Sequence, residues 1–180
     1  MLTSITPSKL VPAAVAGLLA GLVLGTACET EQPPNCGPTE AVVTRVIDGD
    51  TIEIDAEDPV TGTPYHIRYL LVDTPETSGT AECYGFEAKD FNRSIVEGKT
   101  VRLSYDDECT DRYDRLLAYV ELADGRSVNE LLIERGLACV LHIPPNGSDR
   151  VDEYRAAEDR AQAGMVGLWG ACVGVEAPCG

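Results

Sequence analysis

The strongest constraint on the fold is a series of five short β-branched and apolar runs separated by turn signals. Strands of this length form a small sheet or barrel rather than a large open sheet. Asp48-Gly49-Asp50 predicts a hairpin turn between the first two runs, and Ala123-Asp124-Gly125 ends the fifth. The runs cover residues 41–47, 51–56, 65–72, 99–106 and 115–122.

Apolar residues at helical spacing predict three helices, one after the third run and two after the fifth. The first covers 85–97, the second runs from an N-cap at Ser127 to Gly136, and the third covers 149–163. Ser148 or Asp149 is expected to cap the third helix. The apolar positions expected on the first and third helix faces are Ala88, Phe91, Ile95, Tyr154, Ala157 and Ala161.

This order of strands and helices predicts an α+β domain. Five short strands with one helix inserted before the fourth suit a five-stranded OB-fold β-barrel with three helices. The domain is expected to cover residues 41–172, followed by a C-terminal tail at 173–180. The polar, proline-rich segment 28–40 is expected to be a flexible tether.

The N-terminal segment has the features of a signal peptide covering residues 1–27. Lys9 precedes an uncharged, apolar stretch at 10–25, and Thr26-Ala27-Cys28 follows it. The stretch is short for a transmembrane helix, which needs roughly 20 apolar residues. We expect export, either as a lipoprotein anchored to the membrane through a lipidated Cys28 or, after ordinary cleavage behind Ala27, as a secreted protein.

The chain contains 7 cysteines, an odd number. A lipid on Cys28 leaves an even set, and an exported chain meets an oxidising compartment, so disulfides are expected. The pairs Cys139–Cys172 and Cys83–Cys109 are predicted from their positions along the chain. A zinc site is the alternative, but the sequence contains no Cys-x-x-Cys pair and no histidine cluster.

The chain is strongly acidic, with 30 Asp and Glu against 14 Lys and Arg and a formal net charge of −16. Proteins that coat nucleic acid usually present a basic surface. The charge therefore argues against a general DNA-coating protein. It remains compatible with an enzyme that contacts a short stretch of strand through local cations and a metal ion.

Candidate chemistry lies where the predicted strands end. Asp50 follows the first turn, Arg68 lies inside the third run, and Asp73-Thr74-Pro75-Glu76 begins where that run ends. Carboxylates that converge with a Thr carbonyl make a hard oxygen site suited to calcium. Arginines can hold a phosphodiester, and a further carboxylate can activate a water molecule. These parts together indicate a metal-assisted phosphodiesterase.

Three segments carry a resemblance to the staphylococcal nuclease family. The segments are Ile47-Asp48-Gly49-Asp50-Thr51, Arg68-Tyr69-Leu70-Leu71-Val72-Asp73-Thr74-Pro75-Glu76 and Asp111-Arg112-Tyr113-Asp114-Arg115-Leu116-Leu117-Ala118-Tyr119. They occur in the family's order, and the resemblance extends over roughly residues 42–169. It implies the same OB-type barrel and a calcium-dependent nuclease that cleaves DNA and RNA, leaving 3′-phosphate and 5′-hydroxyl ends.

The resemblance also implies a role for each site residue. The expected calcium ligands are Asp50, Asp73 and the carbonyl of Thr74. The expected catalytic residues are Glu76, which acts on the attacking water, and Arg68 and Arg115, which bind the scissile phosphate. Tyr113 is expected to lie along the bound nucleotide. The implied partner is nucleic acid, and a monomer without a protein partner is expected.

Two departures from the family pattern bear on activity. Asp114 stands where the family has Gly, and we expect its charge to pair with Arg115 and to weaken phosphate binding. A family tyrosine that packs on the base has no counterpart near His142 and Pro144. Asp111 is expected only to cap its loop. The alternatives are a non-catalytic OB-fold module that binds nucleic acid or a protein, and an acidic surface lipoprotein that binds calcium for stability.

Overall fold

The computed structural model describes residues 35–175 of the chain. The predicted signal peptide, the predicted lipidation site Cys28, the first part of the predicted tether and residues 176–180 lie outside the described residues. Within residues 35–175, no helix is long and apolar enough to cross a membrane.

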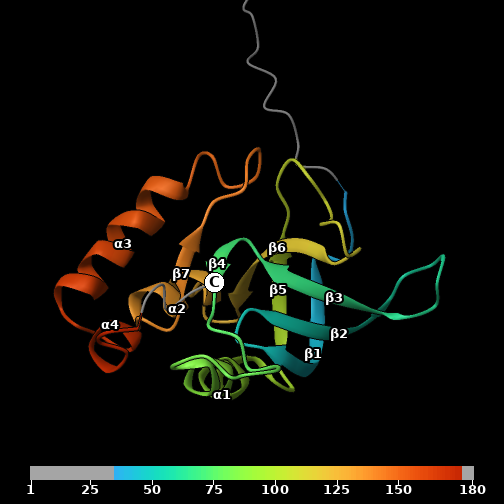
Figure 1. The fold of residues 1–180 in the computed structure, drawn as a ribbon. Helices are drawn as coiled ribbons and strands as arrows, with labels where there is room; N and C mark the ends of the chain where they lie inside the picture. The colour runs from blue at the N-terminus through green and yellow to red at the C-terminus, as the bar shows by residue number, and fades with distance from the viewer. Residues whose placement is uncertain (1–34, 176–180) are drawn as a thin grey trace, which may run out of the picture. The chain divides into compact units, whose positions relative to one another are not determined.

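Five strands form a closed barrel in the order β1-β2-β3-β6-β5, with β5 paired back onto β1 (Figure 1). β3 and β6 run parallel, and the other barrel pairs are antiparallel. This topology confirms the predicted five-stranded OB-fold barrel. The strands are β1 (Glu40–Asp48), β2 (Thr51–Glu57), β3 (Pro64–Tyr69), β5 (Thr100–Ser104) and β6 (Leu116–Leu122).

Alternation of side chains along the strands fills the barrel, because successive residues of a strand point to opposite faces. Val43, Ile52, Ile54 and Ile67 are each at most 1% exposed. The residues between them are more accessible, as in β1, where Thr44 and Arg45 are exposed. The β-branched runs therefore form strands because one face of each is buried.

The three predicted helices are present as α1 (Gly85–Val96), α2 (Val128–Glu134) and α3 (Val151–Ala163). Ser127 caps α2 as predicted, with its side chain accepting a hydrogen bond from Glu130 N. The predicted cap of α3 is wrong: its N-cap is Arg150, and the Ser148 hydroxyl donates instead to the Pro145 carbonyl. A short fourth helix, α4 (Leu168–Ala171), was not predicted. In Figure 1, α1 lies below the barrel, and α3 and α4 lie to its left.

The predicted third strand is in fact two strands. It breaks after Tyr69, and its second part forms β4 (Leu71–Asp73), which pairs with β7 (Cys139–Leu141) outside the barrel. Leu71 has a φ of 61°, in the left-handed region that an L-residue rarely adopts. Asn129 donates to the Leu70 carbonyl and so satisfies the backbone at the break. The break turns the chain away from the barrel just before Asp73.

Both predicted disulfide pairs are wrong. Cys36 is bonded to Cys109, and Cys83 is bonded to Cys172. Cys139 is disulfide-bonded as well. The prediction failed because it assigned Cys36, in the proline-rich segment, to a flexible tether, whereas the barrel brings that segment next to Cys109.

Candidate active site

The Asp50 carboxylate is the most buried acid of the site, in a residue that is 7% exposed. Asp50 lies in the turn between β1 and β2, where Asp48 pairs with Thr51. Thr74 donates to Asp50 Oδ2 from its backbone nitrogen at 3.0 Å and from its hydroxyl at 3.2 Å. The turn and the segment after β4 are therefore joined through Asp50.

Gly49 permits this close approach. A Cβ at position 49 would lie 2.5 Å from Thr74 Oγ1 and 2.7 Å from Thr74 Cβ. Any larger residue would push the turn away from Thr74. The Asp48-Gly49-Asp50 turn thus brings two of the predicted calcium ligands into contact, which is more than a hairpin connection requires.

Arg68 joins the two predicted calcium-binding carboxylates. Its Nη2 atom lies 2.8 Å from Asp73 Oδ1 and 3.3 Å from Asp50 Oδ2, and its side chain is 12% exposed. Its Nη1 atom donates to the Tyr69 and Val72 carbonyls. A partly buried arginine with this many partners holds the end of β3 against β4.

The break at Leu71 makes the Arg68–Asp73 contact possible. In a continuous strand, five residues would separate the two Cα atoms by roughly 16 Å and would place the side chains on opposite faces. Because Leu71 is left-handed, the chain changes direction there and the side chains of Arg68 and Asp73 come into contact. The contact was not derivable from the apolar run in which Arg68 lies.

The carboxylates of this cluster repel one another. Burial raises the pKa of Asp73 to about 6, the nearby Asp50 and Glu76 carboxylates add to the shift, and Arg68 offsets only part of it. Glu76 lies on the surface, but partial desolvation and the Asp48 and Asp50 carboxylates raise the pKa of its carboxyl above the ordinary value. The cluster therefore has more negative charge than its single arginine balances.

The excess charge and the oxygen donors suit a hard divalent cation. Asp50 and Asp73 are held close by their shared contacts with Arg68, and Thr74 lies directly against Asp50. Among residues 35–175, no three His, Cys, Asp or Glu side chains converge to form a metal site on their own. The predicted donor set of two carboxylates and the Thr74 backbone carbonyl stays a prediction, with Asp50 and Asp73 both in contact with Arg68.

Arg115 lies in the connection between β5 and β6 and is paired with Asp111. Its Nε and Nη2 atoms lie 2.7 Å and 2.6 Å from Asp111 Oδ2. Asp111 Oδ1 accepts hydrogen bonds from the backbone nitrogens of Tyr113 and Arg115. Although partial burial opposes it, this set of donors lowers the pKa of Asp111 below its ordinary value.

Asp111 caps its loop as predicted, and it is also the partner of Arg115 that was expected to be Asp114. Asp114 is exposed and has a φ of 61°, which confirms the demanding backbone position, but Arg115 pairs with Asp111. The predicted Asp114–Arg115 pair is wrong, because the turn directs the side chain of Asp114 to solvent. Asp111 was missed; its four-residue spacing from Arg115 becomes informative only once the turn is known.

A cavity of about 500 Å³ lies beside the carboxylate cluster. Its lining includes Arg68, Arg115 and Tyr113, the last of which is 62% exposed. Arg68 belongs both to the cavity wall and to the carboxylate cluster, so the two parts are neighbours. Asp50, Asp73, Thr74 and Glu76 do not line the cavity.

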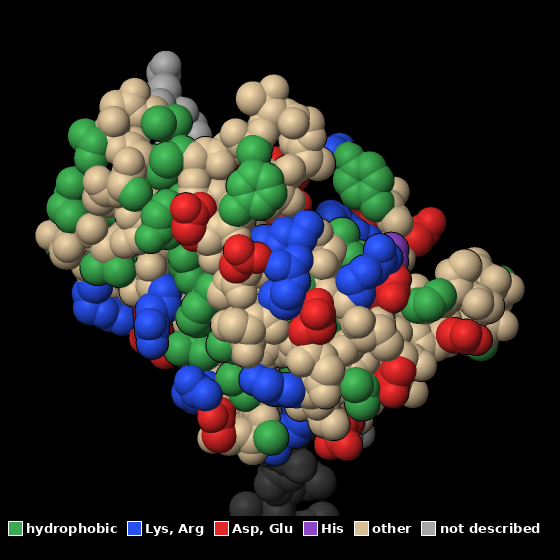
Figure 2. Space-filling model, turned by 90° about the horizontal axis from the view of Figure 1, so that it is seen from below, with side chains coloured by type: hydrophobic (Ala, Val, Ile, Leu, Met, Phe, Trp, Pro, Cys, Tyr) green, Lys and Arg blue, Asp and Glu red, His purple; other side chains and the backbone are tan. Residues whose placement is uncertain are grey.

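The apolar rim of the cavity comes from Leu141 and Ile143, which are 39% and 66% exposed. His142 and Pro144, near which no counterpart of the family tyrosine was expected, do not line the cavity. The face seen in Figure 2 mixes Lys and Arg with Asp and Glu, so the cations are local rather than a continuous basic surface.

The closed barrel defines an OB-fold domain, and the paired carboxylates and the two arginines lie together beside it. Residues 66–171 match the family model described as staphylococcal nuclease homologue. The chain belongs to this family.

Three relatives show the extent of the similarity. Endonuclease YncB of Bacillus subtilis (strain 168) is 38% identical over 129 residues, which are 69% of this chain and 59% of the relative. The SPbeta prophage-derived endonuclease YokF of the same organism is 34% identical over 72% of this chain and 44% of its own length. Thermonuclease of Staphylococcus intermedius is 39% identical over 71% of this chain and 74% of its own. The chain thus spans less than two thirds of the first two relatives.

Proposed function

We propose that this protein is a metal-dependent nuclease that hydrolyses phosphodiester bonds of DNA or RNA, with calcium as its metal. The observation that carries the proposal is the position of Arg68, which contacts Asp50 and Asp73 and also lines the cavity that contains Arg115. Family relatives named endonuclease and thermonuclease support it.

Each predicted residue has a role that its surroundings suit. Asp50, Asp73 and the Thr74 carbonyl would hold calcium, which would neutralise charge developing on the phosphate. Arg68 and Arg115 bind the phosphate oxygens from the cavity side, and Tyr113 borders the nucleotide. Glu76 takes a proton from the attacking water. The raised pKa of Glu76 makes its carboxylate a stronger base than an ordinary surface glutamate.

Cleavage of a single-stranded DNA oligonucleotide by the full-length, oxidised chain tests the proposal. We expect cleavage with calcium and none with a calcium chelator. Arg68→Ala should lower kcat/KM by about 10²- to 10³-fold, and Glu76→Gln should lower kcat by about 10²- to 10⁴-fold. The matched control is Arg126→Ala, which removes an arginine from the exposed ion pair with Asp124 and should cleave like wild type.

Two results would argue against the proposal. Binding of the oligonucleotide without cleavage, in the presence of calcium, would identify the chain as a non-catalytic binding module. Calcium binding without any affinity for the oligonucleotide would identify calcium as a stabilising ligand. An equal loss of activity in Arg68→Ala and Arg126→Ala would contradict the role given to Arg68.

We also propose that the protein is exported and anchored through a lipid on Cys28. The five cysteines within residues 35–175 are all disulfide-bonded, which supports an oxidising compartment. Mass spectrometry of the mature N-terminus distinguishes a lipidated Cys28 from a free one. A mature chain that retains residues 1–27 would contradict both forms of export signal.

A further inference from the structure

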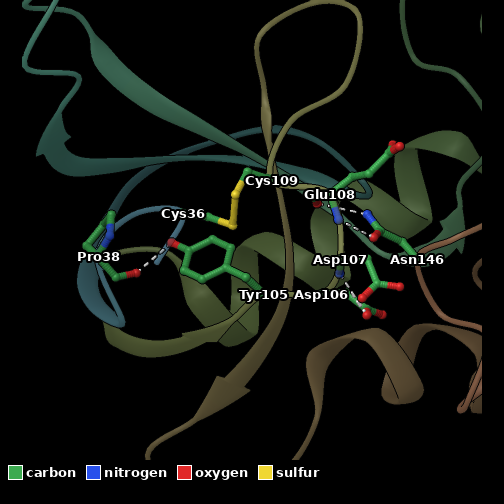
Figure 3. Close-up of a disulfide and its surroundings, with 8 residues drawn as sticks. All are labelled: Cys36, Pro38, Tyr105, Asp106, Asp107, Glu108, Cys109 and Asn146. Atoms are coloured by element: carbon green, nitrogen blue, oxygen red, sulfur yellow. Dashed lines mark hydrogen bonds between the residues drawn. A yellow bond between two sulfur atoms is a disulfide. The ribbon is translucent and has the colours of Figure 1, made fainter. Parts of the chain in front are cut away.

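The segment Cys36–Pro38 is bonded to the connection between β5 and β6 that carries Arg115. The Cys36–Cys109 disulfide joins them across 73 residues of sequence, and the Tyr105 hydroxyl donates to the Pro38 carbonyl at 2.6 Å (Figure 3). This segment belongs to the predicted tether, but it is held to the barrel at two points.

The same segment packs against both ends of the connection. A Cβ at Gly37 would lie 2.9 Å from Leu116 Cδ1 and 3.0 Å from the Tyr105 hydroxyl. Tyr105 begins the connection, and Leu116 follows Arg115 directly. A larger residue at position 37 would have to displace the ends of these two side chains. We name residues 36–38 the N-terminal clamp.

A second set of contacts holds the connection from the opposite side. Asn146 is 4% exposed; its side chain accepts from Glu108 N at 2.7 Å and donates to Glu108 O at 2.9 Å. Gly147 N donates to Asp106 Oδ2 at 2.7 Å. Figure 3 shows Asn146 against Glu108, next to the disulfide. The base of the connection is therefore fixed between two other segments.

Cys109 transmits this restraint to the turn that presents Arg115. Leu117 N donates to the Cys109 carbonyl at 2.9 Å, and Thr110 forms a bridge with Leu116. Asp111 N donates to Arg115 O at 3.1 Å, and the Asp111 carboxylate holds the guanidinium. A continuous ladder thus runs from the disulfide to Arg115.

We propose that the Cys36–Cys109 disulfide is a positioning element for Arg115, so that phosphate handling at the site depends on the oxidation state of this pair. The inference rests on the proposed nuclease function. A dithiol reagent such as dithiothreitol supplies two electrons and two protons, converts the disulfide to two thiols and is itself oxidised to a cyclic disulfide. The clamp then loses its covalent link, and the ladder below Arg115 loosens.

A double-mutant comparison tests the positioning role. Cys36→Ser combined with Cys109→Ser should lower kcat/KM for a single-stranded DNA oligonucleotide by about 10- to 100-fold, because small misplacements of a phosphate-binding group are costly. In the Arg115→Ala background the same change should cost less than about 2-fold, because residues that act as one unit are not additive. Equal losses in both backgrounds would overturn the proposal.

The matched control is the Cys83–Cys172 disulfide. Its sequence separation of 89 resembles the 73 of Cys36–Cys109, so the two bonds constrain the unfolded chain to a similar degree. Cys83→Ser with Cys172→Ser should act independently of Arg115→Ala. Non-additivity in the control as well would assign the effect to general destabilisation and overturn the proposal.

Amide hydrogen exchange tests the clamp without relying on activity. The Tyr113 and Arg115 amides, which donate to Asp111, should exchange about 10-fold faster without the disulfide, while those pairing β1 with β2 should not change. Tyr105→Phe retains the disulfide and should give a smaller increase in the exchange rate of the same amides. If the cysteine variant does not fold, this variant tests the positioning role in its place. Unchanged exchange rates in either variant would overturn the proposal that the clamp positions Arg115. A wild-type chain that does not cleave would overturn the proposed nuclease function. Amide hydrogen exchange would then still test whether the clamp positions Arg115.

Discussion

Arg68 donates a hydrogen bond to Asp73 at 2.8 Å although Arg68 lies within the predicted third strand and Asp73 lies just beyond its end. The left-handed residue Leu71 between them reverses the chain and brings the two side chains together. The same guanidinium contacts Asp50, so one arginine sets the spacing of both carboxylates proposed to bind calcium.

Calcium should stabilise the wild-type fold through these carboxylates. A ligand that binds only the folded state at about 100 times its Kd adds about 2.7 kcal/mol to the free energy of unfolding. Asp73→Asn should lose most of the calcium-induced rise in Tm, because it removes one charged ligand. Asp124→Asn, in an exposed ion pair, should retain the rise. Equal rises in both variants, measured by circular dichroism, would contradict the assignment of Asp73.

Asp114→Gly should increase stability without reducing activity. The left-handed backbone at Asp114 costs an L-residue roughly 1–2 kcal/mol, and glycine removes this strain. Glycine also makes the unfolded chain more flexible, which lowers the free energy of unfolding by about 0.5–1 kcal/mol. The free energy of unfolding should therefore rise by about 0.5–1 kcal/mol.

Asp107→Gly is the matched control for Asp114→Gly. Asp107 lies in the same connection, is exposed and is not among the residues with positive φ within 35–175. Asp107→Gly should lower the free energy of unfolding, as measured by urea denaturation. A loss of stability in Asp114→Gly would show that its side chain makes a contact worth more than the backbone strain.

Asp111 should make the fold sensitive to acid. Its folded pKa lies below the ordinary value of 3.8, so the ionised form stabilises the folded state. This contribution is fully present above the unfolded pKa and is lost as the pH falls through the lower folded pKa. The difference in unfolding free energy between wild type and Asp111→Asn should be constant above about pH 5 and shrink below about pH 4. A difference that stays constant down to pH 2 would contradict the ion pair with Arg115.

The buried pair Tyr69–Asn92 should couple the first helix to the site. The Tyr69 hydroxyl lies 3.0 Å from Asn92 Oδ1, and Asn92, which is 0% exposed, also donates to the Asp48 carbonyl. Asn92→Ala leaves buried polar groups without partners and should cost about 1–3 kcal/mol. Tyr69→Phe together with Asn92→Ala should cost less than the sum of the two single variants. Strict additivity in chemical denaturation would contradict the coupling.

Much of the fold could be predicted because the barrel strands alternate buried and exposed residues. The α3 face was also predicted: Tyr154, Ala157 and Ala161 are 0%, 5% and 2% exposed. On α1 the most buried positions include Asn92 and Val96, whereas the predicted Phe91 and Ile95 are only partly buried. A buried asparagine cannot be predicted from hydrophobic periodicity, because its burial depends on the partner Tyr69.

The remaining features depend on contacts distant in sequence. Residues 65–72 are largely apolar, with no Gly or Pro to mark the break at Leu71, and β4 and β7 are too short to carry a pattern. The disulfide pairs depend on barrel closure, since the cysteines alone allow many connectivities. Asp111 looks like an ordinary loop carboxylate until the turn directs it to Arg115.

The parallel pairing of β3 with β6 has a consequence for the cell that makes this protein. It places Arg68 opposite Leu117, two residues beyond Arg115, and the proposed calcium ligands and both arginines are spread along the chain from Asp50 to Arg115. A nascent or unfolded polypeptide therefore has no assembled site. Under the proposed nuclease function and export, a chain that crosses the membrane unfolded would leave the host's own nucleic acid intact during synthesis, because the site does not exist without tertiary structure.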